Sequence, residues 1–398
     1  MPLQARVLLL GMAMSSDAHS PFPPAGGRLP DVRQIAVLRA NAVGDFIVTL
    51  PALTALKRAY PHAELVLLGK RWHADFLRER SGPVDQVIEL PAVPGVSVDP
   101  NAPFEPGAVQ ALVDRLRARR FDLAVQLHGG GRYSNPFVRR LGARLSVGLC
   151  APDAEPLDRN LPYVDDHHPV SLQLLECVGL AGATSAPLEP QLALRPGDVA
   201  EAAAVVPPTP APLLVLQPGA SHAQKRWAPE RFAAVGDAFA ERGAVVAVHG
   251  SAPESALTSA VCRAMRQPAI DLAGRLSVGG LAGLLARARL LVSNDTGPVH
   301  LARALGTPTV AIFWVANVRS FGPLSTRTQR VATSWRMNCP LCGRNAMTDA
   351  CPHEVSLVDD VPVQAVLELA DSLWDDCPGD QGSTSPGPEN TELQVADQ

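Results

Sequence analysis

The chain has 398 residues, which favours two domains, because a single hydrophobic core rarely grows beyond about 250–300 residues. Its net charge of −4 and pI near 6.2 supply no basic field of the kind that binds phosphate backbones, so nucleic acid is not an expected partner. Seven cysteines are an odd number, and four of them are far apart in the sequence. This pattern indicates a reducing compartment, and we expect a cytoplasmic protein.

The two ends of the chain differ from the rest in composition. The first residues contain a short apolar run, but a Pro/Gly-rich stretch follows it. We therefore predict a disordered extension over residues 1–33 and not a secretory signal. Residues 377–398 are polar and are predicted to be a disordered tail.

The first half alternates short β-branched runs with longer amphipathic segments, which is typical of a parallel sheet wrapped by helices. After the strand at 35–39 comes a turn, one predicted helical run over 46–61 and a second strand. We assign residues 34–204 to a first α/β domain. Its predicted strands cover residues 35–39, 64–69, 86–90, 122–127 and 144–149.

The sequence VVPPTPAP at 205–212 cannot continue a helix or a central strand, since proline lacks an amide donor. We predict an interdomain linker and hinge there, followed by a second doubly wound domain over 213–376. A helix near 362–374 is expected to reach back and brace the first domain. Strands in the second domain are predicted within residues 212–219, 244–250, 286–297 and 307–314.

Ligands of such sheets bind beyond the carboxyl ends of the strands, so the loops there are the candidates for function. In the loop at 39–51, Gly44 and Asp45 stand where the first strand turns into a helix. Asp45 suits either of two roles at this position. It is a helix cap, or it is an exposed general base.

Two loops of the second domain suit a diphosphate. At 216–232, Lys225 lies in a basic turn, which is either a phosphate contact or a solvated surface turn. At 290–308, Asp295, Thr296 and Gly297 precede a helix that opens with proline, so its first amides and its dipole favour an anion. His300 lies one turn further on.

Three segments together resemble the glycosyltransferase family that includes the lipopolysaccharide heptosyltransferases, glycosyltransferase family 9. They are LRANAVGDFIVTLPALTALKRAYPHAEL, QPGASHAQKRWAPERFAAVGDAF and NDTGPVHLARALGTPTVAIF, in that order, within residues 35–375. The resemblance implies an α/β protein with a GT-B fold, in which two Rossmann-like domains face a central cleft. It also implies an inverting transferase that needs no metal or other cofactor, with the acceptor on the first domain and the nucleotide sugar on the second.

The same resemblance implies roles for individual residues. Asp45 matches the catalytic base that removes the proton of the acceptor hydroxyl. The donor, expected to be ADP-heptose, would be held by the residues that match the family's donor motifs, which are Lys225, Glu254, Asp295, Thr296, Gly297 and His300. By position alone, Glu254 is also an ordinary helix-cap residue.

Two further segments match the family only loosely. The glycine-rich loop at 128–140 is a candidate acceptor loop with His128, Gly129 and Arg132. Cys339, Cys342 and Cys351 have the spacing of metal ligands, and His353 is the nearest fourth. We interpret this cysteine segment as a structural loop, with a metal site as the alternative.

Other functions remain as alternatives. A dinucleotide-dependent oxidoreductase is disfavoured because no G-x-G-x-x-G follows the first strand. A GT-B sugar-nucleotide epimerase would use the same donor site without an acceptor, and a non-catalytic nucleotide-sugar-binding protein would keep the fold without turnover. The expected partners are a nucleotide-sugar donor and a glycan or glycolipid acceptor, and a glycolipid would bring the enzyme to the inner face of the cytoplasmic membrane as a peripheral protein.

Overall fold

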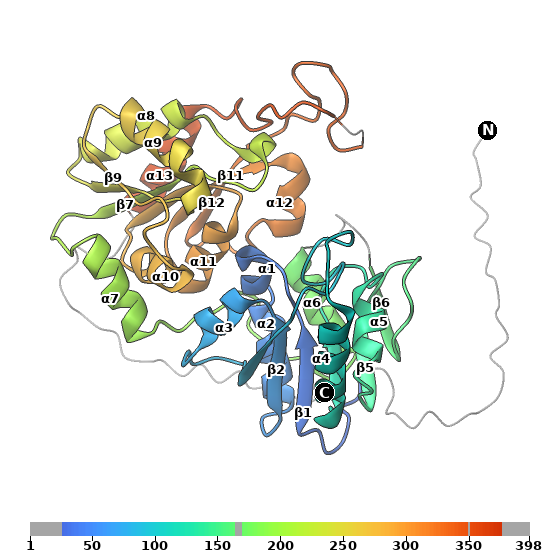
Figure 1. Cartoon of the computed structure of the whole chain (residues 1–398). Helices are drawn as coiled ribbons and strands as arrows, with labels where there is room; N and C mark the ends of the chain where they lie inside the picture. The colour runs from blue at the N-terminus through green and yellow to red at the C-terminus, as the bar shows by residue number, and fades with distance from the viewer. Residues whose placement is uncertain (1–25, 164–168, 349–350, 376–398) are drawn as a thin grey trace, which may run out of the picture.

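The computed structural model describes residues 26–163, 169–348 and 351–375. These residues form two lobes, each a parallel sheet with helices on both faces (Figure 1). The strands of the first lobe are β1 (Gln34–Leu38), β2 (Glu64–Gly69), β3 (Gln86–Glu89), β4 (Leu123–Gln126), β5 (Leu145–Cys150) and β6 (Arg159–Pro162). Its helices are α1 (Val43–Ile47), α2 (Leu50–Ala59), α3 (Arg71–Leu77), α4 (Pro106–Ala118), α5 (Ser134–Arg139) and α6 (Val170–Gly179).

The second lobe repeats this plan. Its strands are β7 (Leu213–Gln217), β8 (Val245–Val248), β9 (Ala269–Asp271), β10 (Leu290–Asn294), β11 (Thr309–Trp314) and β12 (Gln329–Ser334). The helical elements that pack in this lobe are α7 (Pro196–Val205), η1 (Ala223–Lys225), α8 (Pro229–Ala240), η2 (Ala252–Glu254), α9 (Ser255–Ala264), α10 (Val278–Ala286), α11 (Gly297–Leu305), α12 (Val315–Phe321) and α13 (Val363–Trp374).

Both sheets have the same strand order. It is β3-β2-β1-β4-β5-β6 in the first lobe and, read from the opposite edge, β9-β8-β7-β10-β11-β12 in the second. This is the doubly wound order 3-2-1-4-5-6. Successive strands are added on one side of the first strand and then, from the fourth strand on, on its other side. The predicted fold class, two Rossmann-like α/β domains facing each other, is confirmed.

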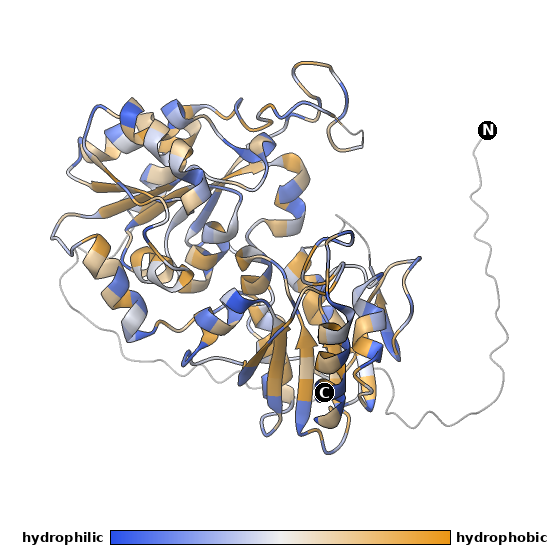
Figure 2. Cartoon of the chain, in the orientation of Figure 1, coloured by the Kyte–Doolittle hydropathy of each residue, from blue (hydrophilic) through white to orange (hydrophobic). Residues whose placement is uncertain are grey.

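The central strands are buried on both faces, as the near-continuous orange of the sheets in Figure 2 shows. One apolar cluster runs through both lobes and joins α2 and α6 of the first to α10 and α11 of the second. Two further clusters cover the outer faces of the two sheets. Because the largest cluster crosses the boundary, the lobes share a core where they meet.

Several local predictions need correction. The single helical run predicted over 46–61 is two helices, α1 and α2, because Pro51 starts a new helix where its missing amide costs nothing. The strands β6, β9 and β12 were not predicted. Residues 26–33, assigned to the disordered extension, pack on the first lobe, where the Leu29 amide donates to the Tyr60 hydroxyl at 3.0 Å. The rest of that extension and the tail at 377–398 lie outside the described residues.

The C-terminal helix α13 does not brace the first domain. It packs against α8 and the strands β10, β11 and β12 of the second lobe, where Trp374 contacts Phe239 at a ring separation of 4.7 Å. The apolar face of α13 therefore covers the second sheet and packs against α8. None of the described helices is both long and apolar enough to span a bilayer.

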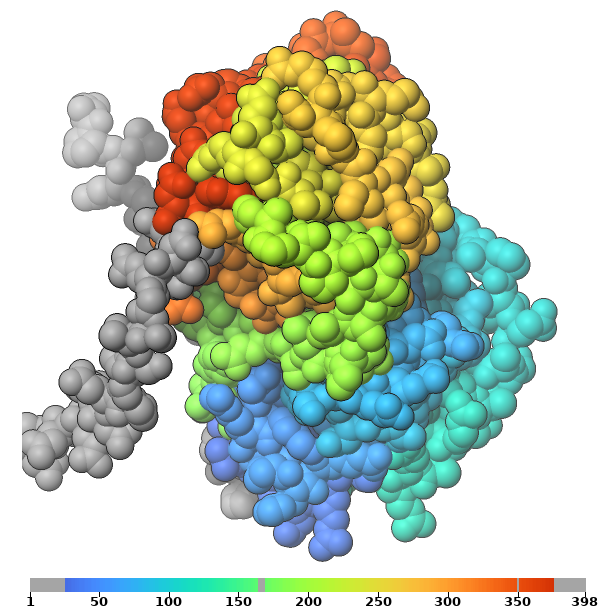
Figure 3. All heavy atoms as spheres, turned by 90° about the vertical axis from the view of Figure 1, so that its left-hand side faces the viewer, coloured from blue at the N-terminus to red at the C-terminus, as the bar shows by residue number. Residues whose placement is uncertain are grey.

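The crossover between the lobes lies before the proline-rich segment 205–212. The helix α7 precedes that segment, yet it packs along α10 of the second lobe, and the Ser277 hydroxyl at the start of α10 donates to Glu201 at 2.6 Å. Figure 3 shows this yellow-green part of the chain lying across the boundary between the blue first lobe and the orange and yellow second lobe.

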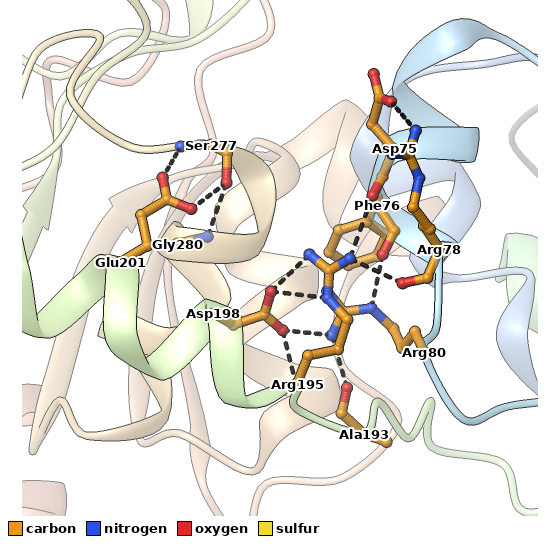
Figure 4. Close-up of polar contacts among 10 residues, drawn as sticks. All are labelled: Asp75, Phe76, Arg78, Arg80, Ala193, Arg195, Asp198, Glu201, Ser277 and Gly280. Carbon is orange, nitrogen blue, oxygen red and sulfur yellow. Dashed lines mark hydrogen bonds and ion pairs between the residues drawn. The ribbon is translucent and has the colours of Figure 1, made fainter.

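A buried ion-pair cluster, which we call the α7 clamp, joins α7 to the first lobe. It consists of Arg80, Arg195 and Asp198 (Figure 4). Arg80 lies 2.8 Å from Asp198, with both side chains 1% exposed, and Arg195 lies 2.8 Å from the other carboxylate oxygen. Arg195 also donates to the carbonyl of Arg78 at 2.9 Å. The α7 clamp therefore ties the end of α3 to the helix that packs on α10.

Candidate active site between the lobes

The candidate residues follow strands at the reversal points of the two sheets. Asp45 follows β1 and His128 follows β4 in the first lobe, while Lys225 follows β7 and Asp295 follows β10 in the second. The carboxyl ends of neighbouring parallel strands meet at one edge of a sheet. The two edges approach each other where α1 contacts α11.

Asp45 lies in the first turn of α1 with its side chain about one-third exposed. One carboxylate oxygen accepts a long hydrogen bond of 3.4 Å from the Ala42 amide, and the other lies 3.4 Å from Arg39. Arg39 is held by its own contacts with the backbone carbonyls of Asp45 and Leu127. Both readings of Asp45 are compatible with this geometry, because a weak cap contact leaves carboxylate lone pairs open.

Asp45 faces a hollow of about 460 Å³ on the first lobe, which we call the acceptor-side hollow. Lys70, His128 and Tyr133 also line it. The Ala40 amide donates to Nδ1 of His128 at 3.2 Å. Burial, with the nearby charges of Arg39 and Lys70, lowers the pKa of His128 to about 4, so its imidazole is neutral near pH 7 and its Nε2 carries the proton.

The other two residues of the candidate acceptor loop lie elsewhere. Arg132 is exposed and pairs with Asp153 at 3.7 Å. Gly129, at φ +63°, turns the chain, and its carbonyl accepts from Gln126 at 3.1 Å. Neither belongs to the lining of the acceptor-side hollow, whereas Tyr133, which the sequence did not single out, does.

On the second lobe, Lys225, Asp295 and His300 form one cluster. Lys225 Nζ lies 3.1 Å from Asp295 Oδ2, and His300 Nε2 lies 4.0 Å from Asp295 Oδ1. Burial is the largest influence on His300 and lowers its pKa, although the charges of Asp295 and Asp45 oppose the change. The influence of Asp45 on His300 reflects the short separation between the two lobes here.

The helix α11 begins at Gly297 with Thr296 as its N-cap residue, and no side chain caps it. Amides of a first helical turn have no partner within the helix, and the dipole makes this end positive. The same end meets α1, where a Cβ atom on Gly44 would lie 2.8 Å from Cδ2 of His300. Glycine at position 44 therefore permits the close approach of the two lobes.

Glu254 and Thr296 line a smaller hollow of about 210 Å³ together with Val43 of the first lobe. Glu254 caps η2, accepting from the Ser251 amide and hydroxyl at 2.8 Å each. His249, from the end of β8, lines the same hollow, and burial lowers its pKa to about 4. Glu254 thus has the cap role that its position predicts, at the edge of a hollow shared by both lobes.

Arg39, Lys70 and His249 were not predicted as site residues. Each directly follows a buried strand, β1, β2 or β8 respectively. Their position in the sequence could have identified them, because the residue after a central parallel strand lies at the edge of the sheet where ligands bind. Their residue types obscured it, since arginine and lysine are most often surface residues.

Comparison with known proteins identifies the family of the chain. The family model described as glycosyltransferase family 9 (heptosyltransferase) matches residues 109–345, more than half of the chain. Lipooligosaccharide heptosyltransferase 2 of Haemophilus influenzae is 24% identical over 310 residues, which are 74% of this chain and 86% of that protein. Lipopolysaccharide heptosyltransferase 2 of Salmonella typhimurium is 27% identical over 359 residues, covering 85% and 98%.

Solved structures show the same fold. The glycosyl transferase family 9 structure from Veillonella parvula has a TM-score of 0.71 at 20% identity, covering 87% of this chain and 98% of that one. The ADP-heptose lipopolysaccharide heptosyltransferase II of E. coli has a TM-score of 0.66 at 22% identity, covering 86% and 98%. The chain thus has the GT-B architecture and belongs to glycosyltransferase family 9, whose members are glycosyl-transferring enzymes.

Proposed function

We propose that this enzyme is an inverting transferase that moves a heptose from ADP-heptose to a lipopolysaccharide-core or other surface-glycan acceptor, with Asp45 as the general base. The arrangement of Asp45 opposite the Lys225, Asp295 and His300 cluster carries the proposal. The carboxylate lies at the acceptor-side hollow, and the cation and the start of α11 lie across the lobe junction. The names of the relatives support heptose as the sugar, and the E. coli enzyme of the same fold is named for ADP-heptose.

The reaction follows from this placement. Asp45 takes the proton of an acceptor hydroxyl while that oxygen forms a bond to the anomeric carbon of the sugar. The bond from the anomeric carbon to the diphosphate breaks, and ADP leaves with its negative charge. Lys225 and the amides at the start of α11 stabilise that growing charge, so they lower the barrier more than they strengthen ground-state binding.

Arg39 is a positioning residue in this mechanism. It contacts the Asp45 carboxylate at 3.4 Å and the Asp45 carbonyl at 3.0 Å, which fixes the direction in which the carboxylate points. Asp295 plays the matching part on the second lobe, because it holds Lys225 at 3.1 Å before the donor binds. Neither residue needs to touch the reacting atoms.

We further propose the division of labour between the domains. The first lobe binds the acceptor, and the second lobe, on which α7 packs, binds the donor. The acceptor-side hollow, which His128 and Tyr133 line, supports the first assignment. The chemistry requires no metal, and the enzyme works in the cytoplasm, at the inner membrane face when the acceptor is a glycolipid.

Calorimetric titration with ADP, UDP and GDP, followed by a transfer assay, tests the proposal. Lys225→Ala should weaken ADP binding about tenfold to a hundredfold, because a charge-assisted contact is worth about 1.5–3 kcal/mol. Lys57→Ala, which removes a surface lysine paired with Asp85, is the matched control and should bind ADP like the wild type.

Asp45→Asn should bind ADP normally and lose about 10²–10⁴-fold in transfer rate. Asp114→Asn, on the exposed face of α4, is its control. Selective binding of UDP or GDP would overturn the donor assignment. Interconversion of the donor sugar without acceptor would identify an epimerase, and donor binding without any turnover would identify a binding protein.

A further inference from the structure

The segment 335–357 of the second lobe contains no described helix or strand. In Figure 1 it is the orange-red loop that extends away from the lobe. Its larger apolar side chains do not form a core, since Trp335 is 72% and Leu341 is 65% exposed. A single bridge between Asn338 and Asn345 is the β-type pairing described in it. Something other than apolar packing must hold this loop in one conformation.

Four potential metal ligands converge inside the loop: Cys339, Cys342, Cys351 and His353, whose ligand atoms all lie within 4.8 Å of one another. The sulfurs of Cys342 and Cys351 are 3.6 Å apart. Nδ1 of His353 lies 3.5 Å from the sulfur of Cys351 and 3.7 Å from that of Cys339. None of the three cysteines forms a disulfide.

These separations are those of a tetrahedron around one zinc ion. Zinc–sulfur bonds of about 2.3 Å and zinc–nitrogen bonds of about 2.0–2.1 Å place the sulfurs about 3.8 Å apart and each sulfur about 3.6 Å from the nitrogen. A disulfide would instead bring two sulfurs to about 2.0 Å. The cluster therefore has the dimensions of a metal site with three sulfur ligands and one nitrogen ligand.

Hydrogen bonds of the backbone hold Cys339 in a turn within the cluster. The Cys339 amide donates to the Arg344 carbonyl at 2.8 Å, and the Gly343 amide donates to the Cys339 carbonyl at 2.9 Å. Gly343 has φ +70°, a conformation that glycine adopts without strain. The amides of Leu341 and Cys342 donate to the Cys339 sulfur.

We propose that Cys339, Cys342, Cys351 and His353 bind one zinc ion in a closed structural site. All four positions of the tetrahedron are filled by protein, so no open position is left for water or substrate, and the ion takes no part in the transfer chemistry. The three thiols lose their protons on binding. The proposal takes the metal site that the sequence left as an alternative for the cysteine segment.

The proposed zinc site is joined to the loop that carries Lys225. Gln224 Nε2 donates to the carbonyl of His353 at 3.1 Å, and the Leu357 amide donates to the carbonyl of Gln224 at 2.8 Å. Ser356 donates to the carbonyl of Arg226 at 2.6 Å. We infer that the metal orders residues 221–226, and this second step rests on the proposed role of Lys225 in donor binding.

Metal content tests the site directly. The full chain, purified without an affinity tag under reducing conditions, should contain close to one zinc ion per chain, and cobalt exchanged for zinc should give the spectrum of a tetrahedral thiolate site. Cys342→Ser should lower the zinc content at least tenfold. Cys262→Ser, which alters a cysteine on α9 outside the cluster, should leave it unchanged.

Three results would overturn the zinc site: no metal in the wild type after growth with added zinc, iron in its place, or a disulfide between Cys342 and Cys351 after alkylation and mass spectrometry. The wild-type measurements decide even if Cys342→Ser does not fold. Hydrogen exchange of residues 221–226 should rise at least threefold in Cys342→Ser. Unchanged exchange in a folded, zinc-free variant would overturn the link to the donor loop alone, whatever the outcome of the transfer assay.

Discussion

The α7 clamp should make a large contribution to stability through one carboxylate. Asp198→Asn keeps the size of the side chain and its ability to accept a hydrogen bond, but it removes the charge between Arg80 and Arg195. Arg80 would then be a buried, unpaired cation, because its side chain is 1% exposed. Breaking a buried pair in this way costs about 3–5 kcal/mol.

Urea unfolding measures this cost. Of the five tryptophans of the chain, Trp72 alone belongs to the first lobe, so the change in total fluorescence follows the unfolding of both lobes. Asp75→Asn is the matched control, because Asp75 is 51% exposed and pairs only with surface arginines, and it should cost about 0–1 kcal/mol. Equal losses in the two variants would refute the reasoning.

The pH dependence gives a second check. Burial raises the pKa of Asp198, but the hydrogen bonds from Arg195 and the charge of Arg80 outweigh it, and the net pKa is lowered. A lowered pKa means that the stabilisation is complete above the unfolded value of about 3.9 and is lost as pH falls through the folded value. The stability difference between wild type and Asp198→Asn should therefore be constant from about pH 5 to 8 and shrink below about pH 4.

Three further predictions follow from the site and the second lobe. Gly44→Ala places a Cβ atom 2.8 Å from Cδ2 of His300 and should lower kcat with little change in ADP affinity; calorimetry and kinetics showing an unchanged kcat would contradict a need for this contact. His128→Asn should raise the acceptor KM and leave the pH–rate profile between about pH 6 and 8 unaltered, because the His128 pKa is about 4; a shifted limb in that range would show that the imidazole titrates during the reaction. Trp227→Ala removes a side chain that is 1% exposed and donates to the Val361 carbonyl at 2.9 Å, and thermal or urea unfolding should record a loss of about 3–5 kcal/mol.

The central strands could be predicted because they are buried on both faces and consist of apolar runs, as in β2 and β10. The strands β6, β9 and β12 could not, since they lie at sheet edges and are short or carry polar residues, as in RNLP and QRVATS. Edge strands pair on one side only, so pairing partners and not composition define them.

In the candidate site too, residues in local sequence patterns could be predicted, and residues brought there only by the fold could not. Asp45, Lys225 and Asp295 each follow a central strand, in segments whose strand-turn-helix pattern is visible in the sequence. Arg39 is a site residue only because the fold buries its guanidinium beside Asp45, and no local pattern distinguishes it from a surface arginine. The convergence of His353 on three cysteines is likewise a property of the folded loop.

The course of the chain through α7 defines which part of the protein can be exchanged as a module. A donor-binding fragment cut at Leu213 would leave behind the helix that covers α10 and would expose an apolar helix face to water. A fragment or chimera that begins between Ala183 and Pro196 keeps α7 with its partner α10, and it divides the α7 clamp and the core that the two lobes share. Donor specificity should therefore be transplanted between relatives with this helix included, even though it precedes the proline-rich segment in the sequence.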